Sequence, residues 1–600
     1  MNSRLLDLAT GIYLAICSMY PAYGGTIKYT LSMPAPETHC FEVKIIHEAT
    51  SNEYTDFIMP AWTPGSYLIR DFAKNVMDVK ASDESQNQLK IVKIDKNTWR
   101  VYHNEPRMIA LIYKVYAFEL SVRTSYLDDV HASISGPGVF MYPDGHSDLP
   151  VQLLVELPSY WSRITTGLAS DPVNPTAFHA SNYDQLVDCP IEIGNHLTFS
   201  FSAAGVDHEV AMVGPGNFDI DRLKTDMARI VKACTDIFGE NPNQRYVFII
   251  YNLENGGGGL EHSNSAFIQV NRWSYQPDNA YLGVLSLIAH EYLHLWIGKR
   301  LRPASLLRYD YTKENYTDLL WIMEGFPSYY DDIMLSRMGY ISGEDYLRRL
   351  NGAINSVEST PGSRVQAVSD ASFDAWIKQY QPDENQNNST VSYYTKGNKL
   401  AALLDLEIIQ STKGEKCMDD LLKTLYTKYY KENIKGITLE DFRNGVEAIT
   451  GHDQKSFFAE YVTGTGEIDY EKYLGYAGIE VRNMLEGDQS PFLGIAIREN
   501  DGKTIVQSVA SGSSGQKAGI SPRDEIIGAD AFRLTSEGIM SLLNTKNTGD
   551  TVRLLIARDG KIMEKNLVLF PANRKQFHLY RPDHATDLQN KVYRKWTRGQ

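Results

Sequence analysis

Two histidines and a glutamate in the segment IAHEYLHLW could bind a metal ion and activate water on it. His290 and His294 stand four positions apart, so on a helix both imidazoles lie on one face and can share one cation. Glu291 lies between them, where its carboxylate can take a proton from a metal-bound water. Zinc suits this chemistry because it lowers the pKa of such a water toward about 7. The spacing predicts a metal-dependent hydrolase.

The alternative is a chance match on an ordinary apolar helix. It would bury two imidazoles and a carboxylate among Leu, Ile and Trp side chains without a partner, which is costly. Catalytic zinc also needs a third protein ligand, and HLWIGKRLR supplies no further histidine. Glu324 is an isolated acid in the apolar segment WIMEGFPSYY. We therefore expect one zinc ion held by His290, His294 and Glu324.

The chain around these residues divides into three regions that differ in the periodicity of their apolar residues. Residues 25–205 alternate apolar and polar positions in short segments, which predicts antiparallel strands and a β-sandwich. Residues 206–487 contain helical periodicity, including a helix that stops at Gly239 and apolar helices over 282–301 and 318–339 that carry the metal ligands. Residues 488–571 return to short strands with one helix. The polar, basic residues 572–600 are expected to form a loosely held tail.

Composition limits the classes of function. The chain has 600 residues, 43% hydrophobic and 22% charged, which is typical of a globular protein of several domains. Its net charge of −15 argues against nucleic-acid binding. The fold class expected is multidomain α+β.

The N-terminus has the features of a secretory signal peptide. One arginine precedes a mostly apolar stretch that ends at Ala22-Tyr23-Gly24, so residues 1–24 predict an exported protein, periplasmic or secreted. An ordinary N-terminal helix is the alternative. No later stretch has the roughly 18 apolar residues that would span a bilayer. Cys40 and Cys189 could pair after export, but the sequence leaves this open.

The metal motifs resemble a known family. HEYLHLW followed by WIMEGFPSYYDD resembles the gluzincin metallopeptidases, although Met323 replaces the asparagine usual before the third ligand. AWTPGSYLIRDFAKNV and the KRLRP after the metal helix are similar to peptidase family M61, the glycyl aminopeptidases. The resemblance covers nearly all of residues 25–571. It implies an N-terminal β-domain, a thermolysin-like zinc peptidase domain with a helical lobe and a C-terminal PDZ domain.

The stretch NLENGGGGLEHSNS is unusual because four glycines are costly to order on folding. GGLEH resembles the exopeptidase motif of related aminopeptidases, which implies that Glu261 binds the free ammonium group of a substrate. Gly258 and Gly259 would then let the substrate backbone pair with an edge strand. A phosphate-binding loop would require Lys-Ser/Thr after the glycines, and the Leu-Glu-His found here does not suit an anion. A plain flexible loop stays possible, because His262 replaces the asparagine of the related motif.

Two further segments extend the resemblance. Tyr394-Thr395-Lys396-Gly397 is similar to the YxKG segment whose tyrosine stabilises the oxyanion in related enzymes, and the adjacent Tyr393 stays an alternative. SPFLGIAIREN resembles the start of a PDZ domain and places its carboxylate-binding loop at Phe492, Leu493, Gly494 and Ile495. The PDZ domain could bind a C-terminal peptide or only pack on the catalytic unit.

The predicted function is a zinc-dependent aminopeptidase that acts on peptides with a free N-terminus. Family resemblance implies a preference for a small first residue, Gly or Ala. Two alternatives remain. One is a PDZ-guided metalloendopeptidase, and the other is a non-catalytic peptide-binding protein with a vestigial metal site.

Overall fold

The computed structural model describes residues 25–49, 53–105, 107–571 and 574–598. They divide into two compact units: one holds the described residues up to Pro64 together with Arg70–Leu197, and the other holds Gly65–Ile69 and the chain from Thr198 onward. The predicted signal peptide lies outside the described residues. Within the described ranges, no helix combines the length and apolar character needed to cross a membrane.

The first unit is rich in β-strands, as expected. Its largest sheet has seven strands, in the order β13 (Ala169–Ser170), β14 (Ala177–Ala180), β11 (Val151–Glu156), β1 (Ile27–Ser32), β2 (Cys40–Ala49), β7 (Arg107–Tyr116) and β4 (Val76–Asp83). Two smaller sheets follow the orders β10 (Tyr142–Pro143), β3 (Tyr54–Ile58), β6 (Thr98–Tyr102), β5 (Lys90–Lys93) and β12 (Arg163–Thr166), β15 (Ile191–Gly194), β9 (Ala132–Ile134), β8 (Tyr126–Leu127). Alternate residues of β2 are buried, which explains the period-two pattern.

One pair in this unit departs from the antiparallel prediction. Strands β1 and β11 run parallel, with Ile27 opposite Val151. The long stretch of chain between them provides the crossover that a parallel pair needs.

Cys40 is a free thiol that donates a hydrogen bond to the carbonyl oxygen of Thr38 at 3.3 Å.

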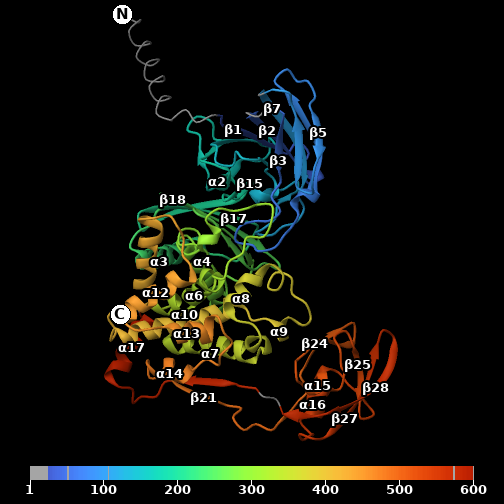
Figure 1. The fold of residues 1–600 in the computed structure, drawn as a ribbon, viewed down its shortest axis with the longest axis vertical. Helices are drawn as coiled ribbons and strands as arrows, with labels where there is room; N and C mark the ends of the chain where they lie inside the picture. Colours follow the sequence, from blue (N-terminus) through green and yellow to red (C-terminus); the bar gives the residue numbers. More distant parts are fainter. Residues whose placement is uncertain (1–24, 50–52, 106, 572–573, 599–600) are drawn as a thin grey trace, which may run out of the picture. The chain divides into compact units, whose positions relative to one another are not determined.

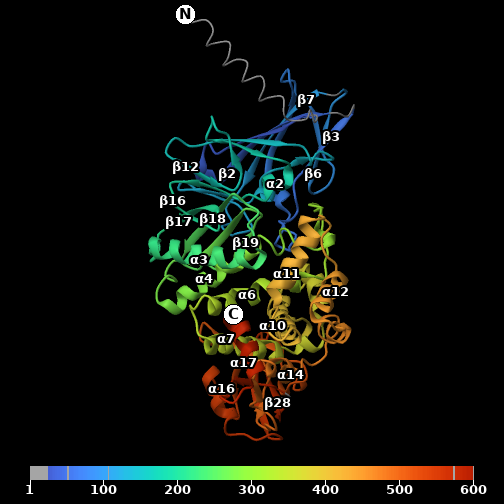
Figure 2. The same cartoon turned by 90° about the vertical axis from the view of Figure 1, so that its left-hand side faces the viewer.

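The second unit begins with a five-stranded sheet. Its order is β16 (Leu197–Ala203), β17 (Val206–Val213), β18 (Arg245–Leu253), β20 (Ser265–Asn271) and β19 (Gly259–Glu261). Strands β17, β18 and β20 are parallel, and β19 runs antiparallel to β20 at the edge. Helix α3 (Ile220–Phe238) ends at Gly239, as predicted, because this glycine adopts the left-handed conformation with φ 80°. Helices α3 and α4 (Asp278–Leu293) lie against one face of the sheet (Figures 1 and 2).

A helical lobe follows the sheet. Its longer helices are α6 (Gly325–Arg337), α7 (Gly343–Ser359), α10 (Tyr393–Ser411), α11 (Met418–Tyr426) and α12 (Leu439–Thr450), and its short ones include α5 (Leu320–Met323), α8 (Val368–Phe373), α9 (Gln386–Ser389) and α14 (Tyr470–Gly475). Helix α10 lies at the centre and packs on α5, α6, α7, α11 and α12. Almost all of its residues from Lys396 to Ile409 are buried, so its apolar pattern extends around the whole helix rather than along one stripe.

The PDZ domain interrupts this lobe. Strand β21 (Glu480–Asn483) leads into it, and β30 (Phe577–Tyr580) returns and pairs antiparallel with β21. The domain contains the strands β23 (Ile495–Asn500), β24 (Lys503–Val509), β25 (Glu525–Ala529), β27 (Thr551–Arg558) and β28 (Lys561–Val568), with helices α15 (Ser514–Lys517) and α16 (Ser536–Leu543). Strand β23 lies at the edge of the sheet. The domain has its own apolar core around Val506, Ile556 and Leu567.

The C-terminal segment is not a loose tail, which corrects the expectation for residues 572–600. After β30 it forms helix α17 (Asp587–Arg598), which buries Val592 and Trp596 completely. Leu588, Val592 and Trp596 are spaced by four on a mostly polar helix, so a narrow apolar stripe was present in the sequence. The Trp596 indole N–H donates to the hydroxyl of Tyr329 on α6 at 2.9 Å. The segment is therefore part of the helical lobe.

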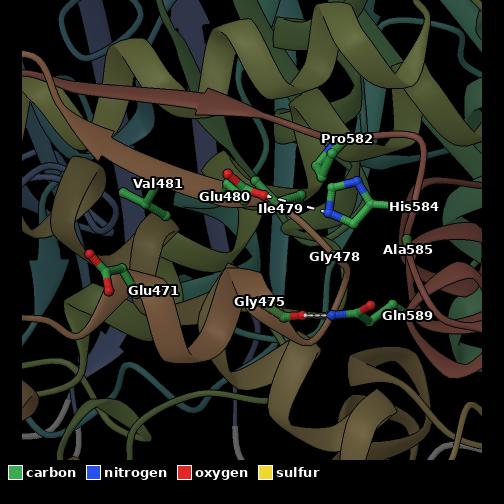
Figure 3. A pocket seen from close by; sticks show the side chains of 10 residues that line it. All are labelled: Glu471, Gly475, Gly478, Ile479, Glu480, Val481, Pro582, His584, Ala585 and Gln589. Carbon is green, nitrogen blue, oxygen red and sulfur yellow. Dashed lines mark hydrogen bonds and ion pairs between the residues drawn. The ribbon is translucent and has the colours of Figure 1, made fainter.

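The start of α17 borders a surface pocket of about 380 Å³ (Figure 3). There the amide of Gln589 donates to the carbonyl oxygen of Gly475 at 2.9 Å, and the His584 ring lies 4.0 Å from the Glu480 carboxylate. These contacts fasten the segment to α14 and β21.

Candidate active site

Helix α4 presents the two predicted histidines at its C-terminal end. The helix stops at Leu293 rather than near residue 301, so His294 is its C-cap residue. The chain turns there because Gly298 has φ 99°, a conformation that suits glycine. The Nδ1 atom of His290 lies 3.2 Å from the Asp331 carboxylate, and that of His294 lies 3.0 Å from the carbonyl oxygen of Ile297. With acceptors at both Nδ1 atoms, each neutral ring carries its hydrogen there and leaves the Nε2 lone pair for a metal.

Glu324 lies opposite these Nε2 atoms. The helix expected over 318–339 is interrupted at this residue, between α5 and α6. Pro327 lacks an N–H and fits only the first turn of a new helix, which explains the break. One Glu324 oxygen lies 3.6 Å from His290 Nε2 and 3.3 Å from His294 Nε2.

The three donors fit a zinc ion. Their atoms all lie within 4.8 Å of one another. Ligands at about 2 Å from a tetrahedral ion are separated by about 3.3 Å, close to the two separations given above. The site also attracts a cation: burial alone would lower the pKa of His290, but Asp331 and Glu324 hold it well above its ordinary value. The two imidazoles in turn outweigh the effect of burial and lower the pKa of Glu324 to about 2.

Asp331 is a residue of the candidate site that the sequence prediction missed. It lies on α6, seven positions after Glu324, and orients the His290 ring. Residues seven apart lie on the same face of a helix, and α6 begins directly after Glu324, so the spacing in EGFPSYYD was a usable signal. The same set of contacts makes the metal ligands part of one packed structure between α4 and α6.

Glu291 is buried beside the metal ligands. Burial, together with the Glu261 and Glu324 carboxylates, raises its pKa to about 7 against the opposing effect of the two histidines. A carboxylate with a pKa close to neutral can both accept and return a proton. A divalent cation at the ligands would lower this pKa, because it favours the charged form.

The glycine loop leads directly over this carboxylate. A Cβ atom on Gly259 would lie 2.2 Å from a Glu291 oxygen, so no other residue fits there without displacing Glu291. Gly258 has φ 99°, and its carbonyl oxygen accepts a hydrogen bond from Gln269 at 2.9 Å. Strand β19 thus begins at the glycines, as predicted for an edge strand, and one glycine is required by contact with Glu291.

Glu261 ends β19 and lies in the same site. Its carboxylate, that of Glu291 and the His294 ring offer atoms within 4.8 Å of one another. The side chain is almost buried, with 9% exposed. The structure therefore brings the predicted amine-binding acid next to the metal ligands.

Helix α10 brings the two candidate tyrosines to the site. A Cβ atom on Gly325 would lie 2.5 Å from the Cα of Gly397, so α10 and α6 touch through a pair of glycines. The Tyr393 and Tyr394 rings stack at 4.7 Å. Tyr393 is fully buried, whereas Tyr394 is partly exposed, so only Tyr394 has a surface that a substrate could touch. Burial, and then the nearby Glu324 carboxylate, raise the pKa of Tyr394 well above 10, which keeps its hydroxyl a donor.

The predicted PDZ loop joins β22 (Pro491–Phe492) to β23. Gly494 has φ 70°, and its carbonyl oxygen accepts a hydrogen bond from Ala510 at 2.7 Å. A pocket of about 260 Å³ opens at this loop, and its lining includes Pro361 and Asn388 of the helical lobe. The Asn388 side chain holds the PDZ backbone through two hydrogen bonds of 2.8 Å, with the carbonyl oxygen of Val509 and the N–H of Ser511.

Known protein families and structures match this chain. Residues 28–195 match the Peptidase M61 N-terminal domain, 283–400 the M61 glycyl aminopeptidase and 491–569 a PDZ domain. The chain is 31% identical over 124 residues to the serine protease Do-like HtrA of Bacillus subtilis, a match that spans 27% of that protein and 20% of this one.

Among solved structures, an aminopeptidase N family protein from Idiomarina loihiensis is similar throughout. It is 30% identical, with a TM-score of 0.87, and the match covers 95% of this chain and all of the other. An M1 zinc metallopeptidase from Deinococcus radiodurans matches with a TM-score of 0.46 and 14% identity over 74% of this chain and 94% of the other. The domain matches, the similarity over the whole Idiomarina chain and the assembled His-His-Glu site together show that this protein belongs to the M61 glycyl aminopeptidase family of zinc metallopeptidases.

Proposed function

We propose that the protein removes single residues from the free N-terminus of peptides. The observation that carries this proposal is the position of Glu261, whose carboxylate lies within 4.8 Å of Glu291 and His294. When the first carbonyl group of a peptide reaches the ion, only the α-carbon of the first residue separates that carbonyl group from the free ammonium group. The carboxylate of Glu261 would then be close enough to that ammonium to hold it by a charge-assisted hydrogen bond.

The side chains divide the reaction among them. One zinc ion, held by His290, His294 and Glu324, would polarise the scissile carbonyl group and make water a stronger nucleophile. Glu291 takes one proton from the attacking water and returns it to the leaving nitrogen. Tyr394 donates a hydrogen bond to the carbonyl oxygen as negative charge develops on it. The new C–O bond replaces the C–N bond, and the products are one amino acid and a shortened peptide.

Strand β19 can hold the substrate backbone. It lies at the edge of its sheet, and its glycines leave room for a close approach. Membership in the glycyl aminopeptidase family supports a small first residue, Gly or Ala. We also propose that the mature protein is exported, and that a peptide C-terminus binds at the loop formed by Phe492, Leu493, Gly494 and Ile495.

Paired substrates test the aminopeptidase assignment. We expect hydrolysis of an alanyl peptide and none of its N-acetylated form, with activity lost to a chelator and restored by zinc. Glu261→Ala should lower kcat/KM on the free peptide by roughly 10- to 100-fold, the effect of one hydrogen bond to a charged group. Glu291→Gln should keep its zinc and lose about 1,000-fold or more in kcat.

Glu254→Ala is the matched control, because this acid lies in an exposed position just before the glycines. It should retain wild-type kcat/KM. Equal cleavage of free and N-acetylated peptides by the wild type would contradict the proposal and indicate an endopeptidase.

A further inference from the structure

A short segment from the N-terminal part of the sequence belongs to the catalytic unit. Gly65–Ile69 groups with the metal site, although the residues on both sides of it belong to the first unit. The Tyr67 ring packs edge-on against Trp376 and Tyr380, with centroids 5.5 and 6.1 Å away. The Tyr380 hydroxyl donates to the carbonyl oxygen of Gly65 at 3.4 Å. The segment is thus held by aromatic side chains of the helical lobe.

Gly65 lies directly against the proposed amine-binding residue. A Cβ atom on it would be 2.8 Å from a Glu261 oxygen and 2.8 Å from Leu260, and its φ of 87° also favours glycine. The backbone of this segment therefore forms one side of the space in which the Glu261 carboxylate lies.

Tyr67 follows Gly65, the residue in contact with Glu261, by two positions, and the charges of both acids of the site act on it. The side chain is 7% exposed, and burial raises its pKa well above 10, followed by the negative charges of Glu324 and, among others, Glu261. Glu324 marks the end where the carbonyl group reacts, and Glu261 marks the end where the ammonium binds. The first residue of the substrate must extend between these two points. Because Gly65 touches Glu261 and the Tyr67 ring is packed against Trp376 and Tyr380, the geometry allows this ring to border that residue.

We propose that the Tyr67 ring forms the wall against which the side chain of the substrate's first residue packs, and that it limits the size of this side chain. The inference rests on the proposed aminopeptidase function and assigns its selectivity to a particular residue. Trp376, which is 3% exposed, and Tyr380 stand behind the ring. A larger substrate side chain would have to displace packed aromatic rings, which a close-packed interior resists.

The test compares p-nitroanilides of Gly, Ala and Leu in the wild type, Tyr67→Ala and Tyr67→Phe. In Tyr67→Ala we expect kcat/KM for Leu relative to Ala to rise by about 10-fold or more, the usual effect of a few methylene groups in a pocket. Tyr67→Phe keeps the ring and should keep the wild-type ratio. Tyr67→Leu should give an intermediate ratio, and it serves if the alanine variant does not fold.

Tyr346→Ala is the control for the loss of a buried aromatic ring. Tyr346 is 2% exposed and packs edge-on against Trp596, and it lies outside the proposed substrate site. This variant should lose thermal stability and keep the Leu-to-Ala ratio. Zinc content, measured by atomic absorption, should be unchanged in the Tyr67 variants.

Three results would overturn the inference. An unchanged ratio in folded, zinc-loaded Tyr67→Ala or Tyr67→Leu would show that the ring does not limit the first residue. A shift in Tyr67→Phe as large as in Tyr67→Ala would assign the effect to the hydroxyl. A wild type that cleaves no free-amine anilide in the presence of zinc would overturn the aminopeptidase function as well, and so separates the two failures.

Discussion

Several glycines around the metal site occupy positions where a side chain would collide with a neighbour. Gly259 lies on Glu291, Gly65 lies on Glu261, and Gly397 lies on Trp321 and Gly325, which stand on either side of Glu324. The first two let backbone approach a residue of the proposed mechanism closely, and the third lets α10 approach the segment that carries Glu324. Ordering a glycine loses more conformational entropy than ordering another residue, and the close approach of the backbone requires that loss.

Gly259→Ala tests this interpretation at the catalytic base. The added Cβ would lie 2.2 Å from a Glu291 oxygen, so the carboxylate must move and kcat should fall by about 100-fold or more. The metal ligands are not touched, and zinc content should stay at one ion per chain. Gly257→Ala is the control, since a Cβ there meets nothing within 4 Å. A Gly259→Ala enzyme with wild-type kcat would disprove the contact.

At the scale of the elements, the sequence predicts helices better than it predicts where they break. Periodicity located α3, α4, α6 and α10, and the spacing of His290 and His294 predicted a shared ligand face. The ends of these helices depend on single residues instead, such as Gly298 after α4 and Pro327 at the start of α6. The breaks set the final positions of His294 and Glu324.

The periodic pattern of apolar residues could not predict contacts between segments that are distant in the sequence. Nothing in AWTPGSYLIRDF indicates that Tyr67 meets Trp376 and Tyr380, because that contact depends on the tertiary fold. The same holds for the choice between Tyr393 and Tyr394. Only the packing of α10 shows that Tyr393 is buried and that Tyr394 is partly exposed. The family resemblance implied roles for Glu261 and Tyr394, and the structure brings Glu261 close to Glu291 and His294 and places Tyr394 under the influence of the Glu324 charge.

Helix α10 also carries a buried lysine that makes stability depend on pH. The Lys399 side chain is 1% exposed, its Nζ has no hydrogen-bond partner among the described residues, and burial lowers its pKa from 10.5 to about 7. Between these two values the unfolded chain binds a proton that the folded chain has lost, so this group makes stability rise with pH.

Lys399→Met should remove this dependence. We expect the variant to have a higher Tm than the wild type below pH 7, and the difference should shrink as pH rises toward about 10. Differential scanning fluorimetry across this range measures it. Lys416→Met, at an exposed position, should differ from the wild type by the same small amount at every pH. A constant difference for Lys399→Met would show that the amine is charged in the folded state.

At the scale of the whole molecule, the PDZ domain lies within the catalytic lobe in sequence order. The chain leaves through β21, forms the domain and returns through β30. It then adds α17, whose Trp596 is fully buried and contacts Tyr329 of α6. Helix α6 also carries Asp331, the partner of His290. The last helix therefore supports the element that holds the metal ligands in place.

Trp596→Ala should expose this dependence. Removing a fully buried tryptophan is expected to lower the free energy of unfolding by about 3–5 kcal/mol. Because α6 loses support, zinc should also be lost at a lower chelator concentration than in the wild type. Trp273→Ala, where the side chain is 58% exposed, is the matched control and should change neither measurement. Unaltered zinc retention in Trp596→Ala would separate α17 from the metal site.

The return of the chain through α17 also sets an order of events during synthesis. Domains fold largely as they emerge from the ribosome, from the N-terminus onward. The helices around α6 emerge long before α17, so the groove that receives Trp596 stays open to water while the ribosome completes the intervening PDZ domain. The catalytic lobe therefore stays incomplete until α17 has been synthesised. A stalled or nicked chain that lacks α17 exposes that apolar surface to chaperones and proteases.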